Sequence, residues 1–148
     1  MQDLNFPAYD FRLKNSENKV WIFDEIRKKF VVLQPEEWVR QHAIKFLIHE
    51  KKYPKSHINV EKQLKVNKVV KRYDIVVFDV DGGIRVLVEC KAPNIKINQK
   101  TFDQIAQYNM RLGAEYLMVT NGLDHYFCKM DYSEEKYHFL EQVPDFSR

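Results

Sequence analysis

The stretch that decides the fold is RYDIVVFDVDGGIRVLVECK, residues Arg72–Lys91. It contains two apolar runs, IVVF and IRVLV, which suit strands buried on both faces of a sheet. Asp81-Gly82-Gly83 lies between the runs, and Asp-Gly between strand-like segments is a strong hairpin signal. The stretch therefore predicts two antiparallel strands joined by a tight turn.

The turn sets the register of this hairpin. If Asp81-Gly82 forms a two-residue type I′ loop, Asp74 faces Glu89 across the strands. Glu89 and Lys91 are two residues apart and share that face, while Cys90 points to the other. The register therefore gathers Asp74, Glu89 and Lys91 into one cluster. A loop displaced by one residue would put Asp74 opposite Lys91 with Glu89 still on that face, and a three-residue loop would break the arrangement.

Two carboxylates held side by side among apolar neighbours repel each other unless a proton or a cation joins them. Mg²⁺ is commonly held by one or two carboxylates plus substrate phosphates, so Asp74 and Glu89 are candidate metal ligands, with Mn²⁺ as a substitute ion. Lys91 would orient a phosphate or a water, or stabilise developing negative charge. The alternative is a plain cross-strand salt bridge in which Lys91 and Arg72 neutralise the two acids.

Asp74 followed by Glu89-Cys90-Lys91 resembles the D…ExK signature of the PD-(D/E)xK nuclease superfamily. Five blocks in order make the resemblance more specific: PEEWVRQ at 35–41, RYDIVVFD at 72–79, VECKAP at 88–93, TFDQIAQYN at 101–109 and YLMVTNG at 116–122. Together they resemble the N-terminal nuclease domain of type I restriction enzyme R subunits, over residues 20 to 130.

The resemblance implies an α/β fold (α+β by some schemes), with an αβββαβ core in which helices flank a mixed central sheet. It also implies Mg²⁺-dependent endonuclease-type hydrolysis of DNA phosphodiesters in a restriction-modification system. Asp74, Glu89 and the main-chain carbonyl of Cys90 would bind the metal, and Lys91 would act on the attacking water. Two alternatives stay open: a non-catalytic nucleic-acid-binding or assembly module, and a nuclease acting on RNA or branched DNA.

Residues 35–51 are predicted to form an amphipathic helix, because Pro35 suits a first turn and apolar residues recur at helical spacing. In the family that this chain resembles, an acidic residue on the first core helix completes the metal site. Glu37 is the first choice for that role. Glu36 is the alternative, because it lies in line with the core-facing residues of the helix.

Residues 101–113 are predicted to form a second helix that ends at Gly113. Gln104 and Tyr108 are four residues apart and therefore lie on one face, which Arg111 extends. A Gln-x-x-x-Tyr pair after ExK is similar to an element that lines the catalytic cleft of many nucleases of this superfamily. The resemblance thus makes Gln104 a catalytic candidate, and Tyr108 and Arg111 nucleic-acid-binding candidates.

Further nucleic-acid contacts are expected on both sides of this site. Residues 51–72 hold eight basic residues against Glu61 alone, and this tract ends in Lys71 and Arg72, just before Asp74. Thr120 and Asn121 end a predicted buried strand, a position often used for ligand contact.

The 148 residues suit one domain, with 45% hydrophobic and 30% charged residues and a net charge of +3. We expect an N-terminal strand meander over 1–34 that packs on the core and has no chemical role, a catalytic core over 35–130 and a C-terminal extension over 131–148. Cys90 and Cys128 lack metal-ligand spacing and are expected to be buried thiols in a reducing compartment.

Partners and compartment follow from what the sequence lacks as well as from the resemblance. No apolar run is long enough to cross a bilayer and no secretion signal is present, so a cytoplasmic location is expected. No GxxxxGK[ST] loop is present, so no ATP site is expected in this chain. DNA is the expected partner, with other subunits of a restriction system or a second copy of the chain as further ones.

Overall fold

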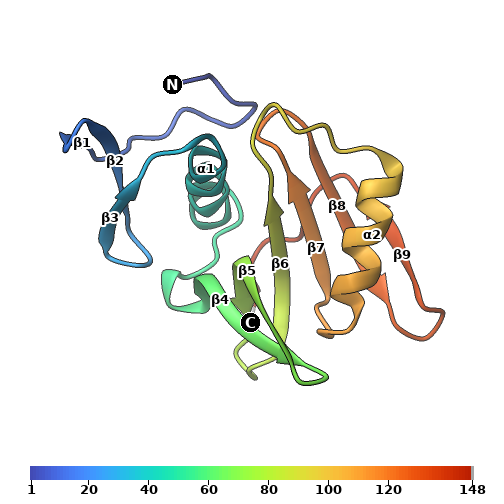
Figure 1. The fold of residues 1–148 in the computed structure, drawn as a ribbon. Helices are drawn as coiled ribbons and strands as arrows, with labels where there is room; N and C mark the ends of the chain where they lie inside the picture. Colours follow the sequence, from blue (N-terminus) through green and yellow to red (C-terminus); the bar gives the residue numbers. More distant parts are fainter. Residues whose placement is uncertain (148) are drawn as a thin grey trace.

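The computed structural model describes residues 1–147, which form two sheets, two α-helices and a 3₁₀ turn (Figure 1). The smaller sheet is an antiparallel meander near the N-terminus. Its strands, in spatial order, are β1 (Leu13–Ser16), β2 (Lys19–Asp24) and β3 (Lys29–Val32). Helix α1 (Pro35–His49) follows directly, and the 3₁₀ turn η1 (Lys55–His57) leads into the larger sheet.

The larger sheet has six strands whose spatial order follows their order in the chain. They are β4 (Ile58–Val66), β5 (Val69–Phe78), β6 (Ile84–Cys90), β7 (Tyr116–Thr120), β8 (His125–Asp131) and β9 (Lys136–Leu140). All neighbouring strands are antiparallel except β6 and β7, which are parallel and joined through helix α2 (Gln99–Met110). This is the αβββαβ core of the restriction-endonuclease-like fold, with β8 and β9 added, as predicted.

The two helices cover opposite faces of the six-stranded sheet (Figure 1). Alternate residues of β6 divide between them: Val86 and Val88 pack in the core beneath α1, whereas Leu87 packs in the core beneath α2. Because both faces of the central strands are covered, these strands read as unbroken apolar runs. The Asp74–Lys91 region lies where β5 and β6 pass between the two helix layers.

The β5–β6 hairpin has the predicted register but not the predicted turn. Val76 pairs with Leu87 and Ile75 with Val88, as expected from an Asp81-Gly82 turn. A register shift after Val77 nevertheless ends the regular ladder, and residues 79–83 form a longer loop in place of the two-residue turn. The loop closes through the 2.7 Å bond from the amide of Asp79 to the carbonyl of Gly83. The irregularity lies at the loop end of the hairpin and leaves the register near Asp74 intact.

The first 34 residues pack on the core instead of forming a separate unit. Ile22 of β2 is fully buried, and Leu4 and Phe6 pack against the core beneath α1. The N-terminal segment runs beside the β7–β8 turn, where the amide of Asn5 donates to the carbonyl of Gly122 at 2.7 Å. In Figure 1, α1 lies between the small sheet and the six-stranded sheet.

The remaining expectations concern the thiols and the membrane. Cys90 and Cys128 are both buried free cysteines, as predicted. Neither helix of the part of the chain that the structure describes is long and apolar enough to span a membrane.

Candidate functional site

The candidate site lies where the regular β5–β6 ladder stops. Ile75 and Val88 are its last regularly paired residues on this side, and Asp74 and Glu89 are the next residue on each strand. The Oδ2 atom of Asp74 accepts the amide of Cys90 at 2.8 Å, so a side chain takes a hydrogen bond that a strand carbonyl would otherwise accept. Asp74 is thereby fixed to the strand that carries Glu89.

The prediction that Asp74 and Glu89 share a face of the sheet is wrong, because the alternation of β5 breaks at this point. Tyr73 belongs to the core beneath α2 and Ile75 to the core beneath α1, although residues two apart normally face the same way. Asp74 turns toward α1, where its Oδ1 accepts from the guanidinium of Arg40 at 2.9 Å. Glu89 is two residues from Leu87 and so lies on the same side of β6, the side that α2 covers.

The two carboxylates still interact, because both lie where the strands separate. Burial, followed by the charge of Asp74, raises the pKa of Glu89 to about 7. The Nζ atom of Lys71 lies 3.8 Å from Oε1 of Glu89, which is close enough for an ion pair but too far for a hydrogen bond. This Oε1 is buried and has no hydrogen-bond partner among the described residues. Glu89 is therefore an acid whose Oε1 is paired with Lys71 at long range but receives no hydrogen bond.

Of the two acids on α1, Glu36 is exposed and senses the charge of Asp74, whereas Glu37 is buried among basic side chains. Glu36 lies in the exposed first turn, and its pKa is raised by partial desolvation and then by the charge of Asp74, while Lys91 opposes the shift. Glu37 is buried, and both its oxygens accept from Arg27 at 3.0 Å. Glu37, the first choice for a metal ligand, is thus engaged by guanidinium groups, whereas Glu36, the alternative, is not.

The positive charge of Lys91 acts on both Glu36 and Glu89. Its charge counters the raised pKa of both acids, yet no carboxylate among residues 1–147 lies within ion-pair distance of its ammonium. Its amide donates to the carbonyl of Thr120 at 2.8 Å, so the backbone at Lys91 is held to the end of β7. A cross-strand salt bridge of Lys91 with Asp74 or Glu89 is therefore not formed.

The predicted nucleic-acid-binding side chains of β5 and α2 divide into two groups. The Nζ atom of Lys71 lies 4.1 Å from the ring centroid of Tyr108, and the Cζ atom of Arg111 lies 5.8 Å from the same centroid. Lys71 therefore connects Tyr108 to Glu89, and Arg111 contacts Tyr108 alone of these residues. Arg72 is exposed and reaches only Glu61, at 4.0 Å. Gln104 is exposed on α2 and makes no hydrogen bond within the described residues.

Thr120 and Asn121 are corrected from cleft residues to turn residues. Both are buried, at 0% and 3% exposure. The hydroxyl of Thr120 contacts Nδ1 of His125 at 2.7 Å, and the side-chain oxygen of Asn121 accepts the amide of Asp124 at 2.8 Å. Their polar atoms therefore stabilise the β7–β8 turn and are not free to contact a ligand.

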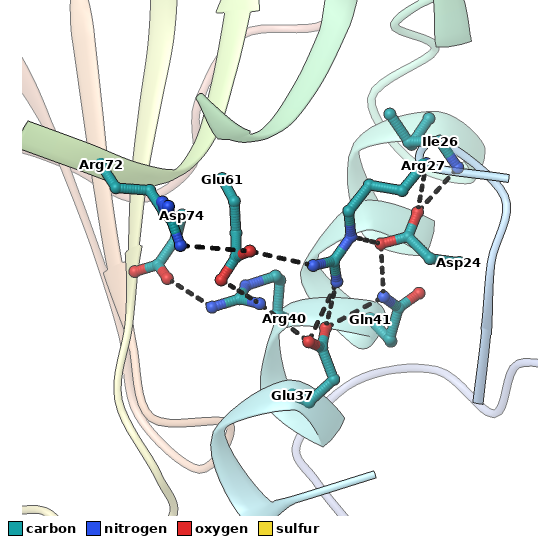
Figure 2. Close-up of polar contacts among 9 residues, drawn as sticks. All are labelled: Asp24, Ile26, Arg27, Glu37, Arg40, Gln41, Glu61, Arg72 and Asp74. Atoms are coloured by element: carbon teal, nitrogen blue, oxygen red, sulfur yellow. Dashed lines mark hydrogen bonds and ion pairs between the residues drawn. The ribbon is translucent and has the colours of Figure 1, made fainter. Parts of the chain in front are cut away.

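A charged network that the sequence analysis missed connects Asp74 to the small sheet (Figure 2). It passes from Asp74 through Arg40 to Glu37 and Glu61, and then through Arg27 to the buried Asp24. Residues 1–34 were expected to have no chemical role, yet Arg27, from the loop between β2 and β3, takes part in this network. The RQ that follows EEWV was the available signal, since Arg40 lies one helical turn after Glu37.

The residues present fit a divalent cation held by few protein ligands. No group of three or more His, Cys, Asp or Glu side chains within residues 1–147 is arranged as a complete metal centre. Mg²⁺ does not require one, because it retains waters and often takes one or two carboxylates with substrate phosphates. The Oε1 atom of Glu89, which receives no hydrogen bond and lies beside the charge of Asp74, is the kind of oxygen that such an ion would bind.

Comparison with known proteins identifies the family. Residues 35–144 match the family described as the type I restriction enzyme R protein N terminus, which covers more than half of the chain. The chain belongs to this family. Glu36, Arg40, Asp74, Glu89 and Lys91 all lie within the matched segment, whereas Asp24 and Arg27 precede it.

A solved structure is also similar to this type I R-protein N-terminal domain. It is a fragment of a protein described as an HsdR subunit of a type I restriction enzyme, from Vibrio vulnificus YJ016. The identity is 21% and the TM-score 0.47, and the match covers 69% of this chain and 22% of that one. This chain thus spans less than a quarter of the length of that fragment. No curated protein matches the chain.

Proposed function

We propose that this domain is a metal-dependent nuclease that hydrolyses DNA phosphodiester bonds within a restriction system. The observation that supports this proposal is the half-buried Glu89, whose Oε1 is buried without a hydrogen bond and whose pKa is raised to about 7 beside Asp74. A desolvated acid with a raised pKa and an oxygen that receives no hydrogen bond is costly for the fold, and such groups concentrate at functional sites. The chain also belongs to the family of type I restriction enzyme R-protein N termini, and this membership supports a nuclease role for the site.

Asp74 and Glu89 would hold the cation, with Glu36 in place of Glu37 as the acid from α1. The main-chain carbonyl of Cys90 stays a predicted further ligand. When bound, a divalent ion lowers the pKa of water and offsets charge on a phosphoryl group. Mg²⁺ is the proposed ion and Mn²⁺ its proposed substitute.

Lys91 would act on the reacting groups, because its ammonium is not engaged by a contacting carboxylate. From its place near Glu36 and Glu89 it would orient the attacking water or stabilise the charge that develops on the phosphate. Lys71, Tyr108 and Arg111 would bind the nucleic acid beside it, as a cation–aromatic group facing a phosphate backbone. Gln104, exposed on the same helix, stays a predicted catalytic residue.

Cleavage of supercoiled plasmid tests this proposal, with Mg²⁺ or Mn²⁺ and with EDTA as the metal-free control. We expect wild-type protein to nick or linearise the plasmid, and Lys91→Ala to lose about 10²-fold or more of that rate. Lys96→Ala is the matched control, because Lys96 is an exposed lysine of the loop that follows Lys91.

Three results would contradict the proposal. Cleavage that survives EDTA would exclude a required metal, and cleavage equally fast in Lys91→Ala would place the activity elsewhere. DNA binding without cleavage under every metal condition would favour a non-catalytic binding module. Faster cleavage of single-stranded RNA than of DNA would change the substrate but not the site.

A further inference from the structure

One residue in the larger sheet has a backbone conformation that a strand does not favour. Glu61 lies within β4, yet its φ is +53°, in the left-handed region. Its neighbours pair regularly, Val60 with Ile75 and Lys62 with Tyr73, so the position opposite Glu61 is that of Asp74. The left-handed region is disfavoured for a residue with a Cβ atom, and such strain recurs at functional sites.

The left-handed conformation places the carboxylate of Glu61 among three guanidinium groups (Figure 2). Glu61 contacts Arg27 at 3.2 Å, Arg40 at 3.4 Å and Arg72 at 4.0 Å. In a regular strand Glu61 would share a face with its cross-strand neighbour Asp74, and the two like charges would repel each other. The unusual backbone thus converts a repulsive pair into an indirect attractive one, through Arg40.

Arg27 joins the same network from the other side. Its guanidinium contacts Asp24 at 2.6 Å, Glu37 at 3.0 Å and Glu61 at 3.2 Å. Glu37 is thus held by Arg27 on one side and by Arg40 on the other, and Arg40 bridges the two acids, with contacts to Glu37 at 2.8 Å and to Asp74 at 2.9 Å.

We propose that Glu61 and Arg27 are positioning residues, which hold the Arg40 guanidinium on one oxygen of Asp74 and so fix the Asp74 carboxylate for a divalent cation. The part of this inference that concerns the cation rests on the proposed function, whereas the part that concerns the Arg40–Asp74 contact rests on the geometry alone. It assigns a role to the small sheet, because Arg27 comes from the loop between β2 and β3. This loop lies outside the segment that matches the family. Residues that orient a ligand from behind typically change metal affinity by about 10–100-fold when mutated.

Glu61→Gly separates a positioning role from a purely structural one. Glycine adopts a positive φ without a Cβ penalty, so this variant should melt no lower than Glu61→Gln, which keeps the strain and loses the charge. If Glu61 positions Arg40, Glu61→Gly should nevertheless bind Mn²⁺ about 10-fold more weakly than wild type, measured by isothermal titration calorimetry. Arg27→Lys, which keeps the charge but loses the forked contact, should weaken Mn²⁺ binding in the same direction.

Glu115→Gln is the matched control. Glu115 pairs with Arg85 at 2.8 Å, and its side chain is 39% exposed against 36% for Glu61, but it lies outside this network. We expect Glu115→Gln to leave Mn²⁺ affinity unchanged. Equal effects of the Glu61 and Glu115 variants would overturn the proposal, as would a Glu61→Gly protein that melts well below wild type with unchanged Mn²⁺ affinity.

A metal-free measurement distinguishes failure of this inference from failure of the proposed function. Nuclear magnetic resonance relaxation of the Arg40 Nε–H group reports directly whether its guanidinium is held. We expect it to be rigid in wild type and mobile in Glu61→Gly and Arg27→Lys, and a rigid Arg40 in both variants would overturn the positioning role. A wild-type protein that binds no Mn²⁺ would refute the metal-dependent function, and Arg40 mobility would then still decide the positioning role.

Discussion

Glu89 is the residue at which stability and the proposed chemistry oppose each other. Its folded-state pKa of about 7 lies well above the ordinary value of 4.5, first because the carboxyl is buried and then because Asp74 is near. Between these two pH values the folded protein holds a proton that the unfolded chain releases. The free energy of unfolding should therefore fall as pH rises through this window, and the cost is fully present above pH 7.

Glu89→Gln should consequently stabilise the metal-free protein at high pH. At pH 8 in EDTA we expect the variant to unfold with a free energy up to about 3 kcal/mol above that of wild type, because each pKa unit corresponds to about 1.4 kcal/mol. At pH 4.5 the two proteins should differ little. Urea unfolding followed by circular dichroism measures both values.

Added Mg²⁺ supplies the control for this comparison. Excess Mg²⁺ at pH 8 should stabilise wild type, because a ligand of the folded state raises the free energy of unfolding, and should have little effect on Glu89→Gln. A Glu89→Gln variant that is less stable than wild type at pH 8 would show that the buried charge is already compensated.

At the scale of elements, the N-terminal segment is held to the β7–β8 turn by a close approach at Gly122. Gly122 has φ of +88°, and a Cβ atom there would lie 2.8 Å from Leu4 and 3.1 Å from Val39. The turn therefore requires glycine both for its backbone conformation and for space.

Gly122→Ala should destabilise the protein by more than the backbone conformation alone explains. Gly113→Ala is the reference, because Gly113 also has a positive φ, +72°, but a Cβ there meets nothing within 4 Å. We expect about 1–2 kcal/mol for Gly113→Ala, and a further loss for Gly122→Ala from the displaced Leu4 side chain. Equal losses of unfolding free energy would show that Leu4 moves aside without cost.

The elements of the core were predictable because each carries a local signal. Helix α1 begins at Pro35 as expected, because proline suits the first turn of a helix. The β5–β6 register was also predictable, because Asp-Gly sets it. The turn itself was not, since a bulge can absorb an extra residue without changing the pairing farther along the strands.

The organisation of the site was only partly predictable. Local pairing, which the sequence encodes, brings Asp74 and Glu89 to adjacent positions, but the turn of Asp74 toward α1 has no such signal. The contact of Arg27 with Glu61 joins residues 34 positions apart, and the left-handed conformation of Glu61 has no signal in its residue type. For the same reason the choice between Glu36 and Glu37 depended on Arg27, which no pattern near α1 announces.

At the scale of the whole molecule, the small sheet and the core should unfold together. Ile22 is buried, and the Asp24–Arg27–Glu37 contacts join the small sheet to α1 across a poorly exposed boundary. Breaking such a pair leaves uncompensated buried charge, which costs about 3–5 kcal/mol. The structure therefore predicts one cooperative unit that includes residues 1–34.

The two tryptophans report on the two parts separately. Trp21 lies in β2 and Trp38 in α1, so Trp38→Phe leaves a probe of the small sheet and Trp21→Phe a probe of the core. We expect the two single-tryptophan proteins to show coincident fluorescence transitions in urea when each is compared with its own circular dichroism. A Trp21 signal lost at lower urea than the circular dichroism would mean that the small sheet detaches first.

The proposed function depends on a divalent cation bound between β5, β6 and α1. A crystal structure grown in Mn²⁺, with anomalous diffraction to locate the ion, tests this most directly. We predict an anomalous peak within coordination distance of the carboxylates of Asp74 and Glu89, with Glu36 turned toward it and Glu37 still bound to Arg27. A peak at another place, or none at these carboxylates in saturating Mn²⁺, would contradict the account.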